Sequence, residues 1–186
     1  MKQLSKLVWS TTAAFALVVA MGATSPAAAQ GKQEFAAGYQ FQNMSAGGGS
    51  TSFPAGWFFD AGFPISFPNL SIVGSVDGSY KSETILTTDV SKKVHTFMGG
   101  IRYSMKASGM MTPFGQFLVG AASTSASAGG TSASNTDGAI DIGGGINWGL
   151  NDKWALRLGI DYRRIMGTVG TNDFRFVAGV ILPIGK

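Results

Sequence analysis

The sequence predicts an all-β protein, an eight-stranded antiparallel up-and-down transmembrane β-barrel with short periplasmic turns and longer extracellular loops. Three observations predict this fold class. Apolar and polar residues alternate with a period of two through much of the chain after residue 30. Aromatic residues gather on one face of successive predicted strands, while the opposite face holds Arg, Asp and Asn beside Gly. The connections between the strands are mostly short and long in alternation.

The clearest alternation lies near the C-terminus. In residues 154–163 every even position is apolar or aromatic, and every odd position is small or charged. Residues 140–150 and 174–182 repeat the pattern. A strand that carries one apolar face and one polar face fits a barrel whose apolar side chains contact lipid and whose polar side chains line the lumen.

The same register predicts the other five strands at 34–42, 56–66, 70–81, 93–105 and 112–123. It turns 15 of the 19 aromatic residues after residue 30 outward, because Trp9 and Phe15 are the only two of the 21 that come earlier. A soluble barrel of the lipocalin type, the main alternative, would bury its aromatic residues instead. We therefore predict an interfacial aromatic girdle, formed by Trp57, Tyr103, Trp148, Trp154 and Tyr162.

The connections support the same topology. Short turns are predicted at 67–69, 106–111 and 151–153. Loops rich in Ser, Gly and Thr are predicted at 43–55, 82–92 and 124–137, with a shorter one at 166–173. Short turns at one end and long loops at the other are typical of outer-membrane barrels.

Residues 1–29 are predicted to be a cleaved signal peptide, and residues 30–186 a single outer-membrane barrel domain. Lys2 and Lys6 precede the apolar stretch 7–21, and three alanines at 27–29 provide a cleavage site. A retained signal anchor is the alternative. Cleavage would remove two lysines and lower the net charge from +4 to +2, so we expect no nucleic-acid partner.

The inward faces predict a network of charged side chains in the lumen. Its members are Asp60, Asp77, Lys81, Arg102, Asp141, Arg157, Asp161, Arg163 and Arg175. The three-residue turn at 151–153 places Asp141 opposite Arg163 and Asn147 opposite Arg157, and Asp161 is expected near Arg175. Because eight strands enclose little space, we interpret the network as a plug, with an ion path as the alternative.

The sequence predicts no catalytic residue, metal ligand or cofactor. The only histidine, His95, falls on the predicted outward face and is followed by Thr96, without a nucleophile in a hydrolase-like pattern. The glycines at 143–145 lie within a predicted strand, with no following helix or lysine, so they indicate barrel wall and not a phosphate-binding loop.

The signal peptide, the strand Phe-Met-Gly-Gly-Ile-Arg-Tyr at 97–103 and the closing strand Phe-Arg-Phe-Val-Ala-Gly-Val at 174–180 carry a family resemblance. The chain resembles the outer membrane protein beta-barrel domain family, the small barrels of the OmpA, OmpX and opacity-protein type. It departs from them by ending on Gly185-Lys186 where the family usually ends on an aromatic residue.

The resemblance implies a structural protein of the bacterial outer membrane. We expect it to be a monomer that contacts membrane lipid and lipopolysaccharide and is inserted by the barrel assembly machinery. A surface adhesin or receptor acting through its loops is an alternative, as is a narrow pore for small solutes. A lipid-modifying enzyme has the weakest support.

Overall fold

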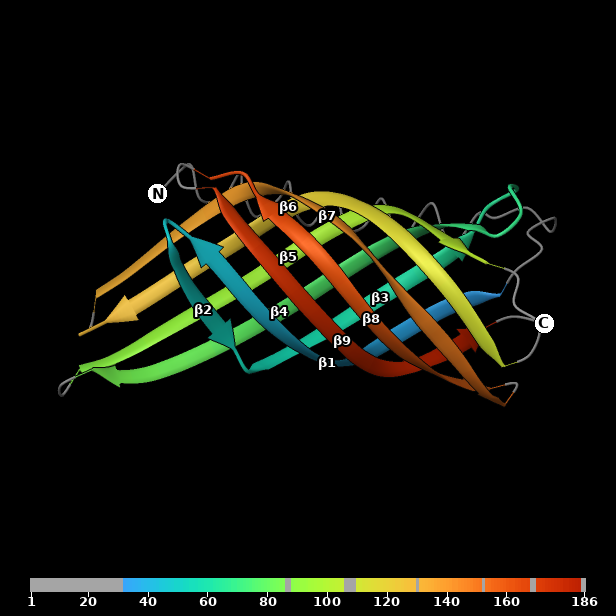
Figure 1. The fold of residues 1–186 in the computed structure, drawn as a ribbon, viewed down its shortest axis with the longest axis horizontal. Coiled ribbons are helices and arrows are strands. Elements are labelled where there is room, and N and C mark those ends of the chain that lie inside the picture. The colour runs from blue at the N-terminus through green and yellow to red at the C-terminus, as the bar shows by residue number, and fades with distance from the viewer. Residues whose placement is uncertain are drawn as a thin grey trace, which may run out of the picture.

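The described part of the chain forms one antiparallel sheet that closes into a barrel (Figure 1). The computed structural model describes residues 32–85, 88–105, 110–129, 131–151, 153–167 and 170–184. The predicted signal peptide lies outside these residues. Within them, no helix is long and apolar enough to cross a membrane. The strands are β1 (Gln33–Ala46), β2 (Gly49–Phe53), β3 (Ala55–Pro64), β4 (Leu70–Ile85), β5 (Thr88–Ser104), β6 (Met111–Ala128), β7 (Thr131–Asn151), β8 (Trp154–Ile165) and β9 (Thr171–Ile184).

Strands β2 and β3 together take the place of one strand in the eight-stranded barrel. This strand is interrupted at Pro54, which has no N–H to contribute to a ladder. Its partner β1 pairs Gln42 with Phe53 in β2 but Tyr39 with Trp57 in β3, so the register shifts by one residue at the proline. When β2 and β3 are counted as one interrupted strand, the barrel has the eight strands that the sequence predicts.

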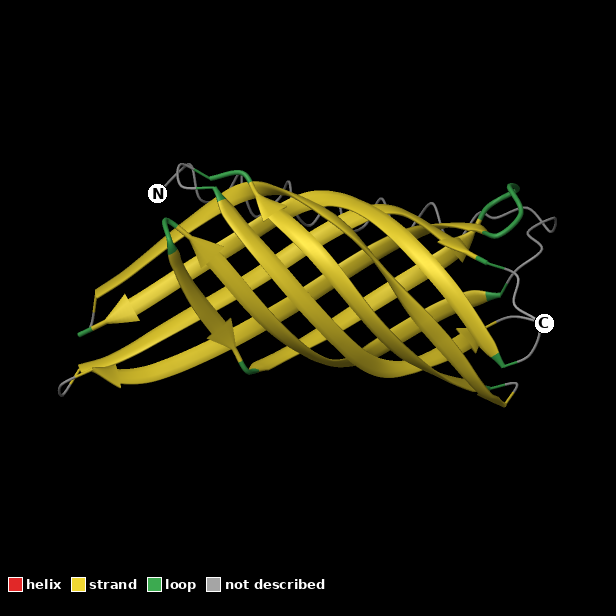
Figure 2. Cartoon of the chain, in the orientation of Figure 1, coloured by secondary structure: helices red, strands yellow, loops and turns green. Residues whose placement is uncertain are grey.

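The barrel closes where β1 pairs with β9. Their ladder runs from Gln33 opposite Ile184 to Ser45 opposite Asn172. Each remaining strand pairs with its neighbours in the sequence, which gives the predicted up-and-down order. Figure 2 shows that the described part of the chain consists of strands joined by short connections. Closure pairs the backbone groups that an open sheet would expose to lipid.

The predicted inward and outward faces are confirmed. The outward side chains Phe97, Ile142 and Leu158 are 50%, 59% and 60% exposed, whereas Asp141 and Arg163 on the inward parity are fully buried. The lumen also contains two apolar clusters. One consists of Val73, Met98, Leu118, Ala122, Ala139 and Ile165, and the other of Ala36, Phe58, Val177 and Ile181.

The three long loops of the prediction are wrong, because most of their residues continue the strands. Residues 43–55 contain the end of β1, a turn at Gly47 and Gly48 with positive φ, and β2. The described residues of 82–92 and 124–137 form the far ends of the β4–β5 and β6–β7 hairpins. Their Ser, Thr and Gly content resembles that of loops, but antiparallel pairing satisfies the backbone as well in small polar residues as in large apolar ones.

These extensions build a four-stranded sheet that stands beyond the barrel wall. Strand β3 last pairs with β4 at Tyr80, and β8 last pairs with β7 at Ala139, yet β4 and β7 both continue. We call residues 81–85, 88–92, 124–128 and 131–138 the protruding sheet. Figure 1 shows its two hairpins reaching past the other strands at one end of the molecule, which we call the hairpin end.

The opposite, short-turn end has compact connections, as predicted at 67–69 and 151–153. The Asn151 Oδ1 atom accepts hydrogen bonds from the backbone N–H groups of Lys153 and Trp154, both at 2.9 Å. The Leu70 N–H donates to the Phe67 carbonyl at 3.3 Å. Asparagine and aspartate favour such turns because their side chains can cap nearby backbone donors. Most of the predicted turn at 106–111 lies outside the described residues.

Candidate functional site

The lumen holds two connected layers of buried charges. The layer nearer the short-turn end, the Asp60 layer, consists of Glu34, Asp60, Arg102 and Arg157. The layer nearer the hairpin end, the Asp77 layer, consists of Asp77, Asp141, Asp161, Asp173, Arg163 and Arg175. All ten side chains lie on the inward parity of their strands, and all except Glu34 are at least 95% buried.

The Asp60 layer is a closed set of two carboxylates and two guanidinium groups. Arg102 lies 2.6 Å from Glu34 Oε1 and 2.8 Å from Asp60 Oδ2. Arg157 contacts the same two oxygens at 2.7 and 3.0 Å. Both guanidinium groups also lie 4.9 Å from the ring centroid of Phe114, a cation–π geometry. The layer is therefore formally neutral, and both of its guanidinium groups contact the Phe114 ring.

The centre of the Asp77 layer is the Asp77 carboxylate. Arg163 Nη2 and Arg175 Nη1 donate to its Oδ2 atom at 2.8 and 2.9 Å, and Arg163 Nη1 donates to Oδ1 at 3.2 Å. The Thr96 hydroxyl donates to Oδ2, and the Gln40 amide donates to Oδ1 at 3.1 Å. One buried carboxylate thus joins side chains of strands β1, β4, β5, β8 and β9.

The remaining contacts confirm the pairs predicted from strand register. Asp141 lies opposite Arg163, with Nε to Oδ2 at 3.1 Å, and Asp161 lies opposite Arg175, with Nη2 to Oδ2 at 2.7 Å. Gln116 Nε2 donates to Asp161 Oδ1 at 2.9 Å, while its Oε1 accepts from Arg102 at 2.6 Å. Gln116 therefore links the two layers.

The third predicted pair lies beside the Asp60 layer. Asn147 lies opposite Arg157, and its Oδ1 accepts a hydrogen bond from Arg157 Nε at 3.0 Å.

Lys81 does not join the network, contrary to the prediction. It has the inward parity, but it lies one residue beyond Tyr80, where β4 rises past its pairing with β3. Its ammonium group instead contacts the exposed Glu83 at 2.6 Å. The hydrogen bond from Lys81 lowers the pKa of Glu83 below its usual value.

Asp173 belongs to the buried layer, although it falls within the connection predicted at 166–173. It is fully buried on β9, two residues before Arg175 and on the same face. The parity of the strand predicts this position once β9 is extended to Thr171.

The five predicted girdle residues all lie on the outer surface. Tyr103, Trp148 and Trp154 lie toward the short-turn end, and Trp57 and Tyr162 lie toward the hairpin end. Their contact with the membrane interface stays a prediction.

His95 lies on the outward parity, as predicted. Its Nε2 atom lies 3.0 Å from the Tyr80 hydroxyl, which accepts a hydrogen bond from Trp57 Nε1 at 3.1 Å. The geometry gives His95 a role in an aromatic surface cluster. Among the described residues, no group of three or more His, Cys, Asp or Glu is placed to hold a metal ion.

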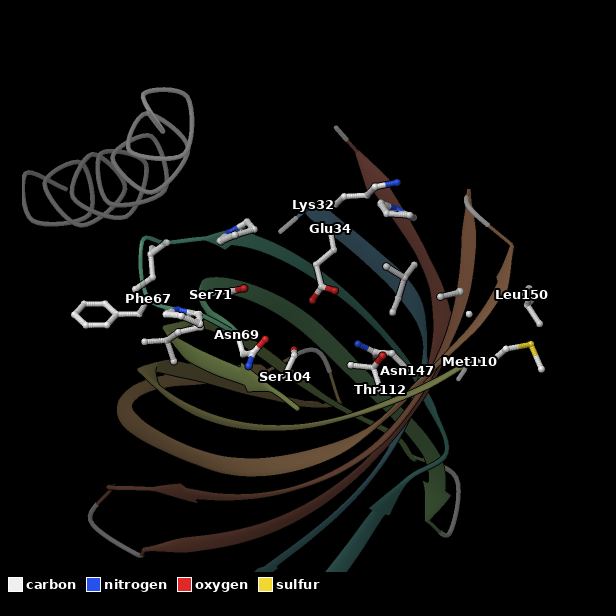
Figure 3. Close-up of a pocket in the computed structure, with 18 of the residues that line it drawn as sticks. Lys32, Glu34, Phe67, Asn69, Ser71, Ser104, Met110, Thr112, Asn147 and Leu150 are labelled. Atoms are coloured by element: carbon white, nitrogen blue, oxygen red, sulfur yellow. The ribbon is translucent and has the colours of Figure 1, made fainter. Parts of the chain in front are cut away.

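A cavity of about 710 Å³ opens at the short-turn end. Figure 3 shows Glu34, Thr112 and Asn147 pointing into it from strands β1, β6 and β7. Glu34 and Asn147 both contact the buried Arg157, so the floor of this vestibule is the Asp60 layer.

Comparison with known proteins decides the family. The model of the family described as outer membrane protein beta-barrel domain matches residues 13–181. The chain belongs to this family. Membership places the protein in the bacterial outer membrane, as the sequence predicts. No curated protein sequence matches the chain.

Solved structures of other outer-membrane barrels share the fold of this family member. Neisserial surface protein A is 16% identical, with a TM-score of 0.71 over 82% of this chain and 97% of that one. Ail, the attachment invasion locus protein of Yersinia pestis, solved with the heparin analogue sucrose octasulfate, is 15% identical, with a TM-score of 0.61 over 82% and 99%. OprG of Pseudomonas aeruginosa is 10% identical, with a TM-score of 0.54 over 85% and 98%.

Proposed function

We propose that this outer-membrane barrel is a plugged anchor that presents the protruding sheet to the outside, where the free edge of β7 binds extended polypeptide segments. In this role the protein is a surface adhesin or receptor. Its outward aromatic residues contact membrane lipid and lipopolysaccharide, and its lumen conducts no solute.

The support for a plug is the filling of the lumen. The four largest fully buried side chains are arginines, each held by carboxylates of other strands. The fully buried apolar side chains of Val73 and Leu118 also occupy the lumen. An eight-stranded barrel has room for side chains but little more.

Planar lipid bilayers that contain the refolded protein are therefore expected to show no steady single-channel openings. A general porin inserted under the same conditions provides the positive control. Steady openings with a fixed conductance would contradict the plug and support the narrow-pore alternative.

The observation that carries the binding proposal is the edge of β7. Among the described residues, the β8 ladder ends where Ala139 pairs with Ile165, and one further bond joins Met166 N–H to the Gly138 carbonyl at 2.8 Å. Because alternate residues of a strand direct their backbone groups to the same side, Ser132, Ser134 and Thr136 direct theirs to this edge as Gly138 does.

The composition of this edge favours pairing with another chain. Residues 131–136 are exposed and contain only Thr, Ser, Ala and Asn. They lack the lysines, prolines and inward charges by which sheet edges usually resist added strands. An extended segment that adds a strand gains main-chain hydrogen bonds, with specificity from alternate side chains.

Proline at Ser134 tests the edge selectively. Ser134→Pro removes an N–H that faces the edge and leaves the ladder to β6 intact, whereas Ser134→Ala keeps the N–H. Cells that display the wild-type barrel are expected to adhere several-fold better than cells without it to surfaces coated with host matrix protein. Ser134→Pro should abolish that gain and Ser134→Ala should retain it. Equal adhesion of all three would rule out the edge, and no adhesion by the wild type would rule out the adhesin.

A further inference from the structure

The two layers of the lumen differ in their balance of charge. The Asp60 layer has two carboxylates for two guanidinium groups. The Asp77 layer has four carboxylates for two guanidinium groups, a formal charge of −2 if every carboxyl is ionised. All six of its side chains are at least 98% buried, where an unpaired charge costs several kcal/mol.

The hydrogen bonds of the two arginines are distributed unequally among the four carboxylates. Arg163 directs both terminal nitrogens to Asp77 and its Nε to Asp141. Arg175 directs two nitrogens to Asp161 and the third to Asp77. The nearest guanidinium nitrogen to Asp173 is 4.0 Å away, so Asp173 receives no hydrogen bond from either arginine.

The same region lacks hydrogen-bond donors. Asp173 Oδ2 accepts from the Gln42 amide at 2.6 Å, but Asp173 Oδ1 has no partner. Asp141 Oδ1 and Gln42 Oε1 are also buried without a partner. These three atoms are acceptors, and one of them belongs to an uncharged amide, so the shortage of donors does not follow from the charge count alone. A fourth buried atom without a partner, Ser75 Oγ, is a hydroxyl that can donate, but Ser75 lies opposite Asp60.

The groups around Asp173 show what can relieve this shortage. It lies opposite Arg163 of β8, which also binds Asp141 of β7 and Asp77 of β4, with Arg175 on its own strand and Gln42 of β1 bonded to it. A proton on Asp173 would remove one excess charge and supply one missing donor at the same atom.

We propose that Asp173 is a proton-binding site of the barrel lumen. At neutral pH, where an exposed aspartate is ionised, the folded barrel holds a proton on this carboxyl and the unfolded chain does not. The folded state then binds more protons than the unfolded state, so the barrel loses stability as the pH rises and the proton leaves.

The test measures urea unfolding of the refolded barrel in lipid vesicles between pH 5 and pH 9. The folding equilibrium constant of the wild type is expected to fall by up to tenfold per pH unit while the folded barrel keeps the proton that the unfolded chain has lost, and to level off once the proton leaves the folded barrel. Asp173→Asn supplies the amide N–H in place of the proton. This variant should lose that slope and should exceed the wild type in stability at pH 9.

A matched control separates this effect from ordinary loss of an ion pair. Asp60→Asn removes a carboxylate of the balanced Asp60 layer that accepts hydrogen bonds from Arg102 and Arg157, so it should destabilise the barrel at every pH and keep the wild-type slope. Infrared difference spectra between wild type and Asp173→Asn should show the carbonyl band of a protonated carboxylic acid at pH 7.

Three results would overturn the proposal. The first is a wild-type stability that does not change between pH 5 and pH 9. The second is an Asp173→Asn variant that is less stable than the wild type at pH 9. The third is stability that depends on sodium or potassium, exchanged for choline at constant ionic strength, and not on pH, because an alkali cation would then neutralise the layer.

Discussion

Asp77→Ala is expected to lower the free energy of unfolding of the barrel by about 3–5 kcal/mol, because it removes one partner of a buried ion network. Asp77 is fully buried and accepts hydrogen bonds from Arg163, Arg175, Thr96 and Gln40. Without it, Arg163 keeps a close contact only with Asp141, and the Thr96 hydroxyl loses its acceptor, while the Gln40 amide keeps its bond to Ser79. Urea unfolding in lipid vesicles, followed by tryptophan fluorescence, measures the change.

Two other acidic-residue variants are expected to behave differently from Asp77→Ala. Glu83→Ala changes another acidic residue of β4, but Glu83 is exposed and forms only the surface pair with Lys81, so unfolding should not change measurably. Asp173→Asn removes a charge from the same layer as Asp77 and is expected to act in the opposite direction at high pH. If Asp77→Ala is as stable as the wild type, the Asp77 carboxylate does not hold the layer together.

The contacts of Arg163 with Asp141 and with Asp77 show how much of the lumen can be predicted from the sequence. Parity identifies which side chains face inward, and a short turn fixes the partner across a hairpin, so the Asp141–Arg163 pair is predictable. Asp77 and Arg163 belong to β4 and β8, which do not pair. Their 2.8 Å contact depends on the tilt and stagger of the closed barrel, which a single sequence does not specify.

The hairpin end was harder to predict for a different reason. Alternation of apolar and polar residues marks a strand only where one face contacts lipid or a core. In the protruding sheet both faces meet water, so 131–136 can be Ser, Thr, Ala and Asn throughout and lose the pattern while the backbone ladder continues. The predicted position of Lys81 in the lumen is wrong for a related reason. Inward parity places a side chain in the lumen only where the strand still belongs to the closed barrel.

Gly143→Ala is expected to destabilise the barrel by disturbing the charge network of the lumen. A Cβ at Gly143 would lie 1.8 Å from Asp161 Oδ1 and 2.7 Å from the Ile160 carbonyl oxygen. The Asp161 carboxylate would have to move, and it holds both Arg175 and Gln116. We expect a loss of at least about 3 kcal/mol, seen in urea unfolding and as loss of the compact band on unboiled gels.

A neighbouring glycine separates this effect from the general cost of altering a strand glycine. Gly115 on β6 is exposed toward lipid, and the nearest atom to its Cβ would be the Gly143 carbonyl oxygen at 3.9 Å, so Gly115→Ala should fold like the wild type. The cost of Gly143→Ala should shrink in an Asp161→Ala background, where the carboxylate no longer occupies that space. Equal costs in both backgrounds would assign the damage to the Ile160 backbone, and the glycine at 143 would then serve the wall and not the charge network.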